Sequence, residues 1–93
     1  MSLSIIIPVR NEEEIILKTL ERFDNSWLTQ IEHEIIIIND NSSDETTNLI
    51  KNSNFKKISI VLKDNSKKDL GSAILTGINN SSKKYVSIYM ADM

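Results

Sequence analysis

Polar residues with ligand-binding chemistry follow each of the four apolar runs in the chain. These groups are Pro-Val-Arg-Asn-Glu at 8–12, Asn-Asp-Asn at 39–41, Lys-Asp-Asn at 63–65 and Ala-Asp at 91–92. In open parallel sheets ligands bind outside the carboxyl ends of the strands, so we expect the four groups to converge on one edge. Asp40 follows an apolar run after one asparagine, at the expected strand tip, where its carboxylate can accept hydrogen bonds from a nucleobase N–H or a ribose hydroxyl.

Gly71 and the two lysines before it, Lys67 and Lys68, form a second candidate binding feature. Gly71 opens a predicted helix, and the first backbone N–H groups of a helix favour anions. A diphosphate at this helix start would meet both the backbone donors and the lysine ammonium groups. The simpler interpretation, a turn glycine beside solvated lysines, stays open.

Several other chemistries lack the residues that they need. No G-x-G-x-x-G or G-x-x-x-x-G-K-[ST] pattern follows the first apolar run, which disfavours dinucleotide binding and excludes a P-loop. The one histidine, His33, lies in a mixed connection with no nucleophile beside it, so a catalytic triad is unsupported. The chain has no cysteine, which excludes disulfides and zinc–thiolate sites. A net charge of −2 provides no field that attracts nucleic acid, so no nucleic-acid partner is expected.

The spacing of apolar residues predicts the elements that position these groups. Strands are predicted at residues 3–9, 34–39, 58–63 and 85–90, and helices at 12–23, 43–52 and 70–80. The order β-α-β-α-β-α-β predicts an α/β fold, a Rossmann-like parallel sheet with helices on both faces and the strand at 34–39 near its centre. Gly77, inside the last helix, is expected to mark close packing of helix on sheet.

Two of the predicted helices start with capping signals. Asn11 with Glu14 resembles a capping box, and Ser42 with Glu45 forms a second box of the S-x-x-E type. These side chains are therefore expected to cap helices. Trp27, after the first helix, is expected to pack in the core or against a loop.

Length and composition indicate one small globular domain or part of a larger one. The chain has 93 residues, of which 40% are hydrophobic and 26% charged. Its longest aliphatic run, residues 35–38, is far shorter than the roughly 20 residues of a membrane helix, so a cytoplasmic protein is expected. The predicted strand at 85–90 has no helix after it, which favours the N-terminal part of a larger sheet. Val86, Ile88 and Met90 would then form an apolar edge, through which this segment is expected to self-associate.

Four segments resemble motifs of family 2 glycosyltransferases. They read S-I-I-I-P-V-R-N-E-E-E at 4–14, E-I-I-I-I-N-D-N-S-S-D-E-T at 34–46, L-G-S-A followed by G-I at 70–78, and Y-V-S-I-Y-M-A-D-M at 85–93. The third resembles the L-G-x-A-x-x-x-G segment of the polyprenyl-phosphate (dolichol-phosphate) mannosyltransferase branch, and the fourth resembles a segment that contains a D-x-D metal motif. The motifs follow the family's order across residues 1–93. The chain therefore resembles the N-terminal, nucleotide-sugar-binding part of such a domain, truncated just after the D-x-D-like position.

The resemblance implies a GT-A fold, a nucleotide-sugar donor such as GDP-mannose or a UDP-sugar, and inversion at the anomeric carbon. It implies a Mg²⁺ or Mn²⁺ cofactor, which Asp92 would bind. It also implies a lipid-phosphate or glycan acceptor, for example a polyprenyl phosphate, at the cytoplasmic face of a membrane. Carried over by position, the residues that would contact the nucleotide are Pro8, Arg10 and Glu12 in the pocket lining, Asp40 at the base or ribose, and Asp64 beside the base. Lys68 and Gly71 at the diphosphate complete the predicted nucleotide-binding set, and no catalytic residue is assigned.

Two residues depart from the family pattern. Asn39 stands where the family's D-D pair has its first aspartate, and a neutral amide there still forms hydrogen bonds. Met90 stands where the D-x-D motif has its first aspartate, and a thioether does not bind Mg²⁺ or Mn²⁺. Met90 favours the main alternative, a non-catalytic nucleotide-binding module, and the third alternative is a structural fold without a ligand. The segment alone is expected to be inactive as an enzyme.

Overall fold

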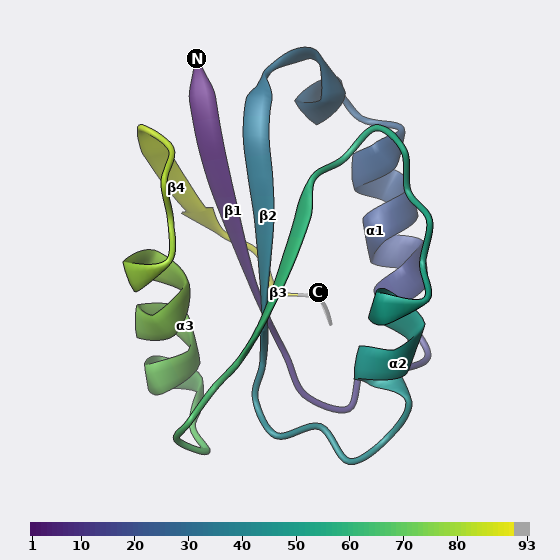
Figure 1. Cartoon of the computed structure of the whole chain (residues 1–93), viewed down its shortest axis with the longest axis vertical. Helices are drawn as coiled ribbons and strands as arrows, with labels where there is room; N and C mark the ends of the chain where they lie inside the picture. The colour runs from purple at the N-terminus through teal and green to yellow at the C-terminus, as the bar shows by residue number, and fades with distance from the viewer. Residues whose placement is uncertain (91–93) are drawn as a thin grey trace.

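The computed structural model describes residues 1–90 and shows one sheet of four parallel strands between helices (Figure 1). The strands are β1 (Ser2–Val9), β2 (Glu32–Asn39), β3 (Ile60–Asp64) and β4 (Tyr85–Ile88), in the spatial order β3-β2-β1-β4. The helices are α1 (Ile16–Asp24), the short 3₁₀ helix η1 (Trp27–Gln30), α2 (Thr46–Lys51) and α3 (Leu70–Asn79). The predicted α/β, Rossmann-like fold is confirmed, with the predicted second strand at the inside of the sheet.

Isoleucine runs in β1 and β2 form the two cores, one on each face of the sheet. Ile5, Ile7, Ile35 and Ile37 pack on the face that α1 and α2 cover. Their neighbours alternate to the other face, where Ile6, Ile36 and Ile38 pack with Ala73 of α3. Because both faces are covered, these strands are continuous apolar runs rather than alternating ones.

Gly77 brings α3 close to the sheet, as predicted. Gly77 is buried, and a Cβ at this position would overlap Cγ2 of Ile6, which is itself fully buried. Any side chain at residue 77 would therefore move α3 away from β1.

The helix boundaries differ from the sequence prediction. The predicted helix starts at 12 and 43 are wrong, because α1 begins at Ile16 and α2 at Thr46. Strand β2 begins at Glu32 and so includes His33, whose ring nitrogens contact the carbonyl oxygen of Ile31 and the N–H of Ser59. Trp27 is 64% exposed, so its predicted place in the core is wrong, and its packing against a loop stays a prediction.

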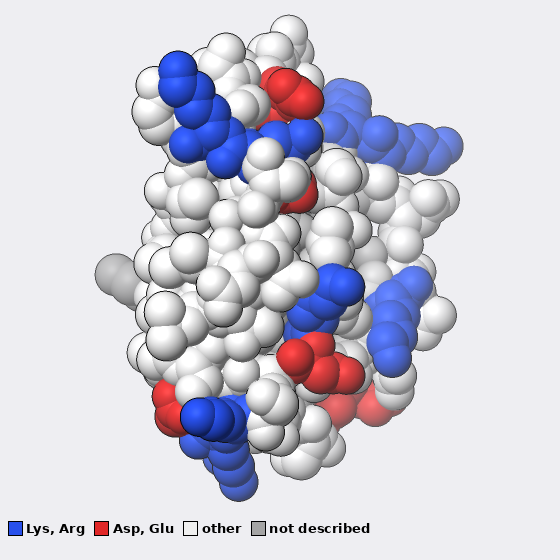
Figure 2. All heavy atoms as spheres, turned by 60° about the vertical axis from the view of Figure 1, so that its left-hand side comes forward, with Lys and Arg blue, Asp and Glu red and all other residues white. Residues whose placement is uncertain are grey.

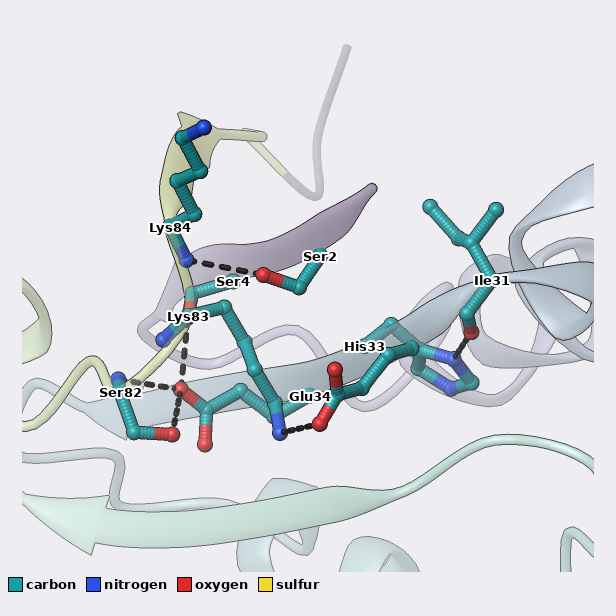
Figure 3. Close-up of polar contacts among 9 residues, drawn as sticks. Ser2, Ser4, Ile31, His33, Glu34, Ser82, Lys83 and Lys84 are labelled. Atoms are coloured by element: carbon teal, nitrogen blue, oxygen red, sulfur yellow. Dashed lines mark hydrogen bonds and ion pairs between the residues drawn. The ribbon is translucent and has the colours of Figure 1, made fainter.

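A polar cluster joins the segment before β4 to the amino ends of β1 and β2 (Figure 3). One oxygen of Glu34, Oε2, accepts hydrogen bonds from Ser4 Oγ (2.6 Å), Ser82 N (2.6 Å) and Ser82 Oγ (2.9 Å). The backbone N–H of Lys83 donates to Ser4 Oγ (3.2 Å), and its ammonium group pairs with Glu32 (3.1 Å). We call the residues Ser4, Glu34, Ser82 and Lys83 the amino-edge cluster.

The outer strand β4 is the least covered strand among the described residues. Tyr85, Val86 and Ile88 are exposed, and the register places Val86 and Ile88 beside Ser4 and Ile6, on the α3 face. Figure 2 shows this face as a largely uncharged area between charged side chains at its two ends. Within residues 1–90 no helix has both the length and the apolar character that a membrane crossing requires.

Candidate functional site

A cavity of about 220 Å³ lies at the carboxyl edge of the sheet, where the ends of β1 and β2 meet the start of α3. Its lining combines apolar and charged side chains: Pro8, Val9, Arg10, Glu12, Asp40, Asp69, Leu70 and Met90. Four of these, Pro8, Arg10, Glu12 and Asp40, belong to the predicted nucleotide-binding set. Pockets for drug-sized ligands usually measure roughly 300–1,000 Å³, so this cavity suits one portion of a nucleotide rather than all of it.

A larger hollow, of about 680 Å³, lies at the opposite edge. It is lined by Met1, Ser2, Glu32, Lys84 and Tyr85. All of these except Ser2 are exposed, and no buried polar group points to a ligand there. The smaller cavity is therefore the better candidate site.

Asn11 joins the loop after β1 to the loop after β2. Its backbone N–H donates to Ser42 Oγ (3.0 Å), and its Oδ1 accepts from the N–H of Ser43 (2.8 Å). Asn11 and Asn41 both have the left-handed backbone, with φ of 53° and 62°, which asparagine adopts more readily than most residues. The predicted Asn11–Glu14 capping box is wrong, because Ile15 is the N-cap of α1 and has no side-chain cap bond.

The Ser42–Glu45 box is wrong for the same reason. Glu45 occupies the N-cap position of α2 without a side-chain cap bond. The side-chain oxygen Oγ1 of Thr46 instead accepts a hydrogen bond from the backbone N–H of Glu12 (2.8 Å). The backbone N–H of Thr46 donates to Asp44 Oδ1 (3.0 Å). Burial alone would raise the pKa of Asp44, but the hydrogen bonds from Thr46 and from the backbone of Glu13 outweigh it and lower this pKa. The two loops are thus bonded into one rim beside the cavity.

Asp40 is a buried carboxylate of the cavity lining, 5% exposed. Its backbone N–H donates to the carbonyl of Val9 (2.8 Å), which continues the β1–β2 pairing to the strand tip. Its Oδ1 accepts from the side-chain amides of Asn65 (3.0 Å) and Asn41 (3.4 Å). The structure thus places Asp40 in the cavity lining, and the ligand role that the sequence predicts for it stays a prediction.

The amide of Asn39, where the family has an aspartate, fits the carboxylate of its neighbour on β3. The register pairs Asn39 with Asp64, and Asn39 Nδ2 donates to Asp64 Oδ1 (3.1 Å) while its Oδ1 accepts from Ser42 N (3.0 Å). The family's aspartate at this position would place a second carboxylate against Asp64. Asp64 itself is exposed and lies outside the cavity lining, so its predicted place beside a base stays a prediction.

Asp69 is a lining residue that the sequence reasoning missed, although its place before a predicted helix was a signal for an N-cap. Its carboxylate accepts from Ser72 N (2.7 Å) and Ser72 Oγ (2.9 Å), and these bonds, with a smaller contribution from the charge of Lys67, lower its pKa. The start of α3 therefore already holds a carboxylate. Gly71 and Lys68 are exposed beside it, outside the lining, and a diphosphate there would meet this negative charge.

The described residues do not form a metal site by themselves. Across residues 1–90 no group of three histidine, aspartate or glutamate side chains is close enough to hold a cation. The predicted ligand, Asp92, lies outside the described residues. Met90 lines the cavity and offers only a thioether.

Comparisons with known proteins identify relatives along almost the whole chain. The family model described as "Glycosyl transferase family 2" matches residues 4–93. The chain is 34% identical to "Probable glycosyltransferase YdaM" of Bacillus subtilis, over 96% of this chain and 22% of that protein. It is 30% identical to "Dolichol-phosphate mannosyltransferase" of Pyrococcus furiosus, over 100% of this chain and 26% of that protein. The chain thus spans about a quarter of the length of these relatives.

A solved structure shows the same fold. The chain superposes on part of the crystal structure of S. aureus TarS residues 1–349, with a TM-score of 0.86 and 19% sequence identity, covering 99% of this chain and 28% of that one. A second structure of TarS, in complex with UDP, gives a TM-score of 0.87. At this identity the comparison supports the arrangement of strands and helices.

Proposed function

The chain belongs to glycosyltransferase family 2, and we propose that the full-length protein transfers a sugar from a nucleotide-sugar donor to an acceptor. The observation that carries the proposal is the carboxyl-edge cavity. It brings together Arg10, Glu12 and Asp40 from two loops that are bonded to each other. We propose that this cavity holds the base or the ribose of the donor.

The charges of the lining favour this placement. Glu12, Asp40 and Asp69 are acidic and Arg10 is the one cation among the lining residues, so the cavity attracts N–H and hydroxyl donors. A diphosphate needs positive charge, which this lining does not supply in excess. We therefore place the diphosphate outside the cavity, with a Mg²⁺ or Mn²⁺ ion for which Asp92 is the proposed ligand.

In the proposed reaction an acceptor oxygen forms a bond to the anomeric carbon of the sugar. The bond from that carbon to the diphosphate oxygen breaks, the nucleoside diphosphate leaves with the bonding electrons, and the configuration inverts. The described residues bind and orient the donor in this scheme. No residue of the chain is proposed as the catalytic base.

The donor and the acceptor are proposed by class. UDP-sugars and GDP-mannose are the candidate donors, since TarS was crystallised with UDP and one relative is named a dolichol-phosphate mannosyltransferase. The name of that relative also favours a lipid phosphate as acceptor, at the cytoplasmic face of a membrane. We further propose that the isolated segment self-associates through the exposed apolar side chains of β4, Val86 and Ile88.

Met90 keeps one alternative open. It lines the cavity at the position where the family motif has an aspartate, so a protein that binds the nucleotide without transferring a sugar is the second candidate. Sugar transfer itself distinguishes the two, because both bind the nucleotide.

The test is calorimetry on the full-length protein with UDP, GDP, UDP-glucose and GDP-mannose, each with Mn²⁺ and with a chelator. Binding of at least one nucleotide, tighter with Mn²⁺, is the expected result. Release of nucleoside diphosphate in the presence of a polyprenyl phosphate would then favour the transferase over the binding module. Absence of binding to all four compounds would overturn the proposal.

A further inference from the structure

Asn65 is a buried amide that connects three parts of the candidate site. It follows β3 directly and is 5% exposed. Its Nδ2 donates to Asp40 Oδ1 (3.0 Å), to the carbonyl of Lys67, and to the carbonyl of Asp69 (3.2 Å). Its Oδ1 accepts from Thr76 Oγ1 of α3 (3.2 Å).

These contacts require an amide of this length. The side-chain NH₂ group has two hydrogens and faces three acceptors, so at least one hydrogen is shared. Aspartate would keep the bond from Thr76 and lose both donors, and leucine would lose every contact. A buried, fully bonded amide also resists rotation, because turning it would bring its oxygen against three other oxygens.

The contacts of Asn65 hold two sides of the cavity together. Asp40 comes from the end of β2, whereas Asp69 comes from the start of α3, and both line the cavity. Among the described residues, the two amide donors to the Asp40 carboxylate, Asn65 and Asn41, both act on Oδ1. Oδ2 is then the oxygen that can accept from a base or a ribose.

We propose that Asn65 is a positioning residue of the nucleotide site, which orients the Asp40 carboxylate and fixes the backbone at 67–69 beside it. This inference rests on the proposed function of the cavity. Asn65 acts through Asp40 and the start of α3, and its effect on the ligand is therefore indirect.

The test compares Asn65→Asp with Asn54→Asp in the full-length protein. The two substitutions make the same chemical change, but Asn54 is exposed in the connection between α2 and β3. At pH 8 we expect Asn65→Asp to weaken the binding of the tightest of UDP, GDP, UDP-glucose and GDP-mannose by roughly tenfold or more. Asn54→Asp should bind as the unmodified protein does.

The pH dependence of nucleotide affinity distinguishes a positioning role of Asn65 from a purely structural one. The introduced carboxyl would face the carboxylate of Asp40, and two like charges at this distance raise the pKa at which the pair takes up one proton. Once protonated, the introduced group donates to Asp40 again. The affinity of Asn65→Asp relative to the unmodified protein should therefore recover as the pH falls from 8 to about 5.5, at temperatures where both proteins are folded.

Two results would overturn the positioning role. One is an affinity of Asn65→Asp equal to that of Asn54→Asp, and the other is an affinity loss that stays constant with pH. If Asn65→Asp does not fold, Thr76→Val removes only the bond to Asn65 Oδ1 and should weaken binding in the same direction by a smaller factor. Unchanged affinity in Thr76→Val would then overturn the inference.

A ligand-free measurement distinguishes this inference from the proposed function. The ¹³C resonance of the Asp40 carboxyl should move in Asn65→Asp or Thr76→Val and stay in place in Asn54→Asp. Absence of nucleotide binding by the unmodified protein would overturn the proposed function and with it the role of Asn65 in nucleotide binding, whereas a response of the Asp40 resonance would still show that Asn65 orients Asp40. An Asp40 resonance that does not respond to either substitution would overturn the role of Asn65 alone.

Discussion

The two edges of the sheet both carry clusters of polar residues, but they use them differently. At the amino edge, Glu34 Oε2 receives three hydrogen bonds within the protein (Figure 3). At the carboxyl edge, Arg10, Glu12 and Asp40 line a cavity of about 220 Å³. The first cluster joins strands to each other, and the second presents charged groups to a space that a ligand can enter.

The two edges differ in how much of their hydrogen-bonding capacity is used within the protein. Polar groups that bond mainly to one another contribute to the fold, because each hydrogen bond within the protein reduces their capacity to bind a ligand. The carboxyl edge also has such bonds, from Asn11 to Ser42 and from Glu12 to Thr46, and they make its rim rigid. A rigid rim around an open lining is the arrangement that preorganises a binding site.

The largest expected effect is on binding, at the carboxyl edge. Asp40→Asn should weaken nucleotide binding by roughly ten- to a hundredfold, because a hydrogen bond to a charged group contributes about 1.5–3 kcal/mol. Thermal unfolding should change little, since the amide keeps an oxygen for Asn65. Calorimetry on the full-length protein measures the affinity, and Asp24→Asn, which keeps the acceptor for Lys57 N, is the matched control. Equal affinities of the two variants would remove Asp40 from the site.

The next-largest effect is expected for a substitution in α3, because this helix lies along the sheet between the two edges. Gly77→Ala should lower the free energy of unfolding by about 1–3 kcal/mol, because the new methyl group overlaps Ile6. It should also weaken nucleotide binding, since a displaced α3 moves Asp69 and Leu70 of the lining.

Gly71→Ala is the control for this substitution in denaturant unfolding. A Cβ at Gly71 would lie 3.4 Å from Asp69 Oδ1, an ordinary contact, so its stability should be unchanged or slightly higher. If Gly77→Ala were as stable as Gly71→Ala, the close packing of α3 on β1 would be contradicted.

A smaller effect is expected at the amino edge, on stability alone. Glu34→Gln should lower the free energy of unfolding by about 1 kcal/mol at pH 7, because three charge-assisted hydrogen bonds become weaker. Nucleotide affinity should stay the same. Glu32→Gln on the same strand removes only an exposed ion pair with Lys83 and should change stability less. A loss of nucleotide binding in Glu34→Gln would contradict the conclusion that the amino edge contributes to stability and not to binding.

The smallest expected effect is the pH dependence of the stabilisation by Glu34. Burial alone would raise the pKa of Glu34, but the hydrogen bonds from Ser4 and Ser82 and the charge of Lys83 outweigh it and lower this pKa below its ordinary value of 4.5. The stabilisation by Glu34 is therefore present above that ordinary value and is lost as the pH falls through the lowered pKa. The difference in Tm between the unmodified protein and Glu34→Gln should shrink between pH 5 and pH 3. A difference that is constant with pH would exclude the charge of Glu34 as its cause.

Much of the fold follows from short-range patterns that the sequence displays. The isoleucine runs predict buried strands, and their alternation with helical stripes predicts parallel pairing, because a crossover helix returns the chain in the same direction. Pro8, Arg10, Glu12 and Asp40 were predicted as neighbours from their places at strand ends, and the structure brings them to one cavity.

The helix starts and the roles of individual polar residues could not be predicted from such short-range patterns. Asn11 and Ser42 fit a local cap as well as a contact between loops, and both patterns need the same residue types. The contact that forms joins residues 31 positions apart, so it depends on the pairing of β1 with β2. Asn65 also bonds to the nearby carbonyls of Lys67 and Asp69, but its contacts with Asp40 and Thr76, 25 positions before it and 11 after it, leave no local sign in the sequence.

The types and order of the elements, the two apolar cores and the set of polar residues at the strand ends can be predicted from the sequence. Those features depend on the spacing of neighbouring residues, which periodicity reveals. The strand order β3-β2-β1-β4 and the pairing of Asn39 with Asp64 are known only from the three-dimensional structure. The same is true of which polar groups bond to each other and which line the cavity. Each of these depends on register between segments far apart in the chain, and a shift of one residue would turn the same side chains to the opposite face.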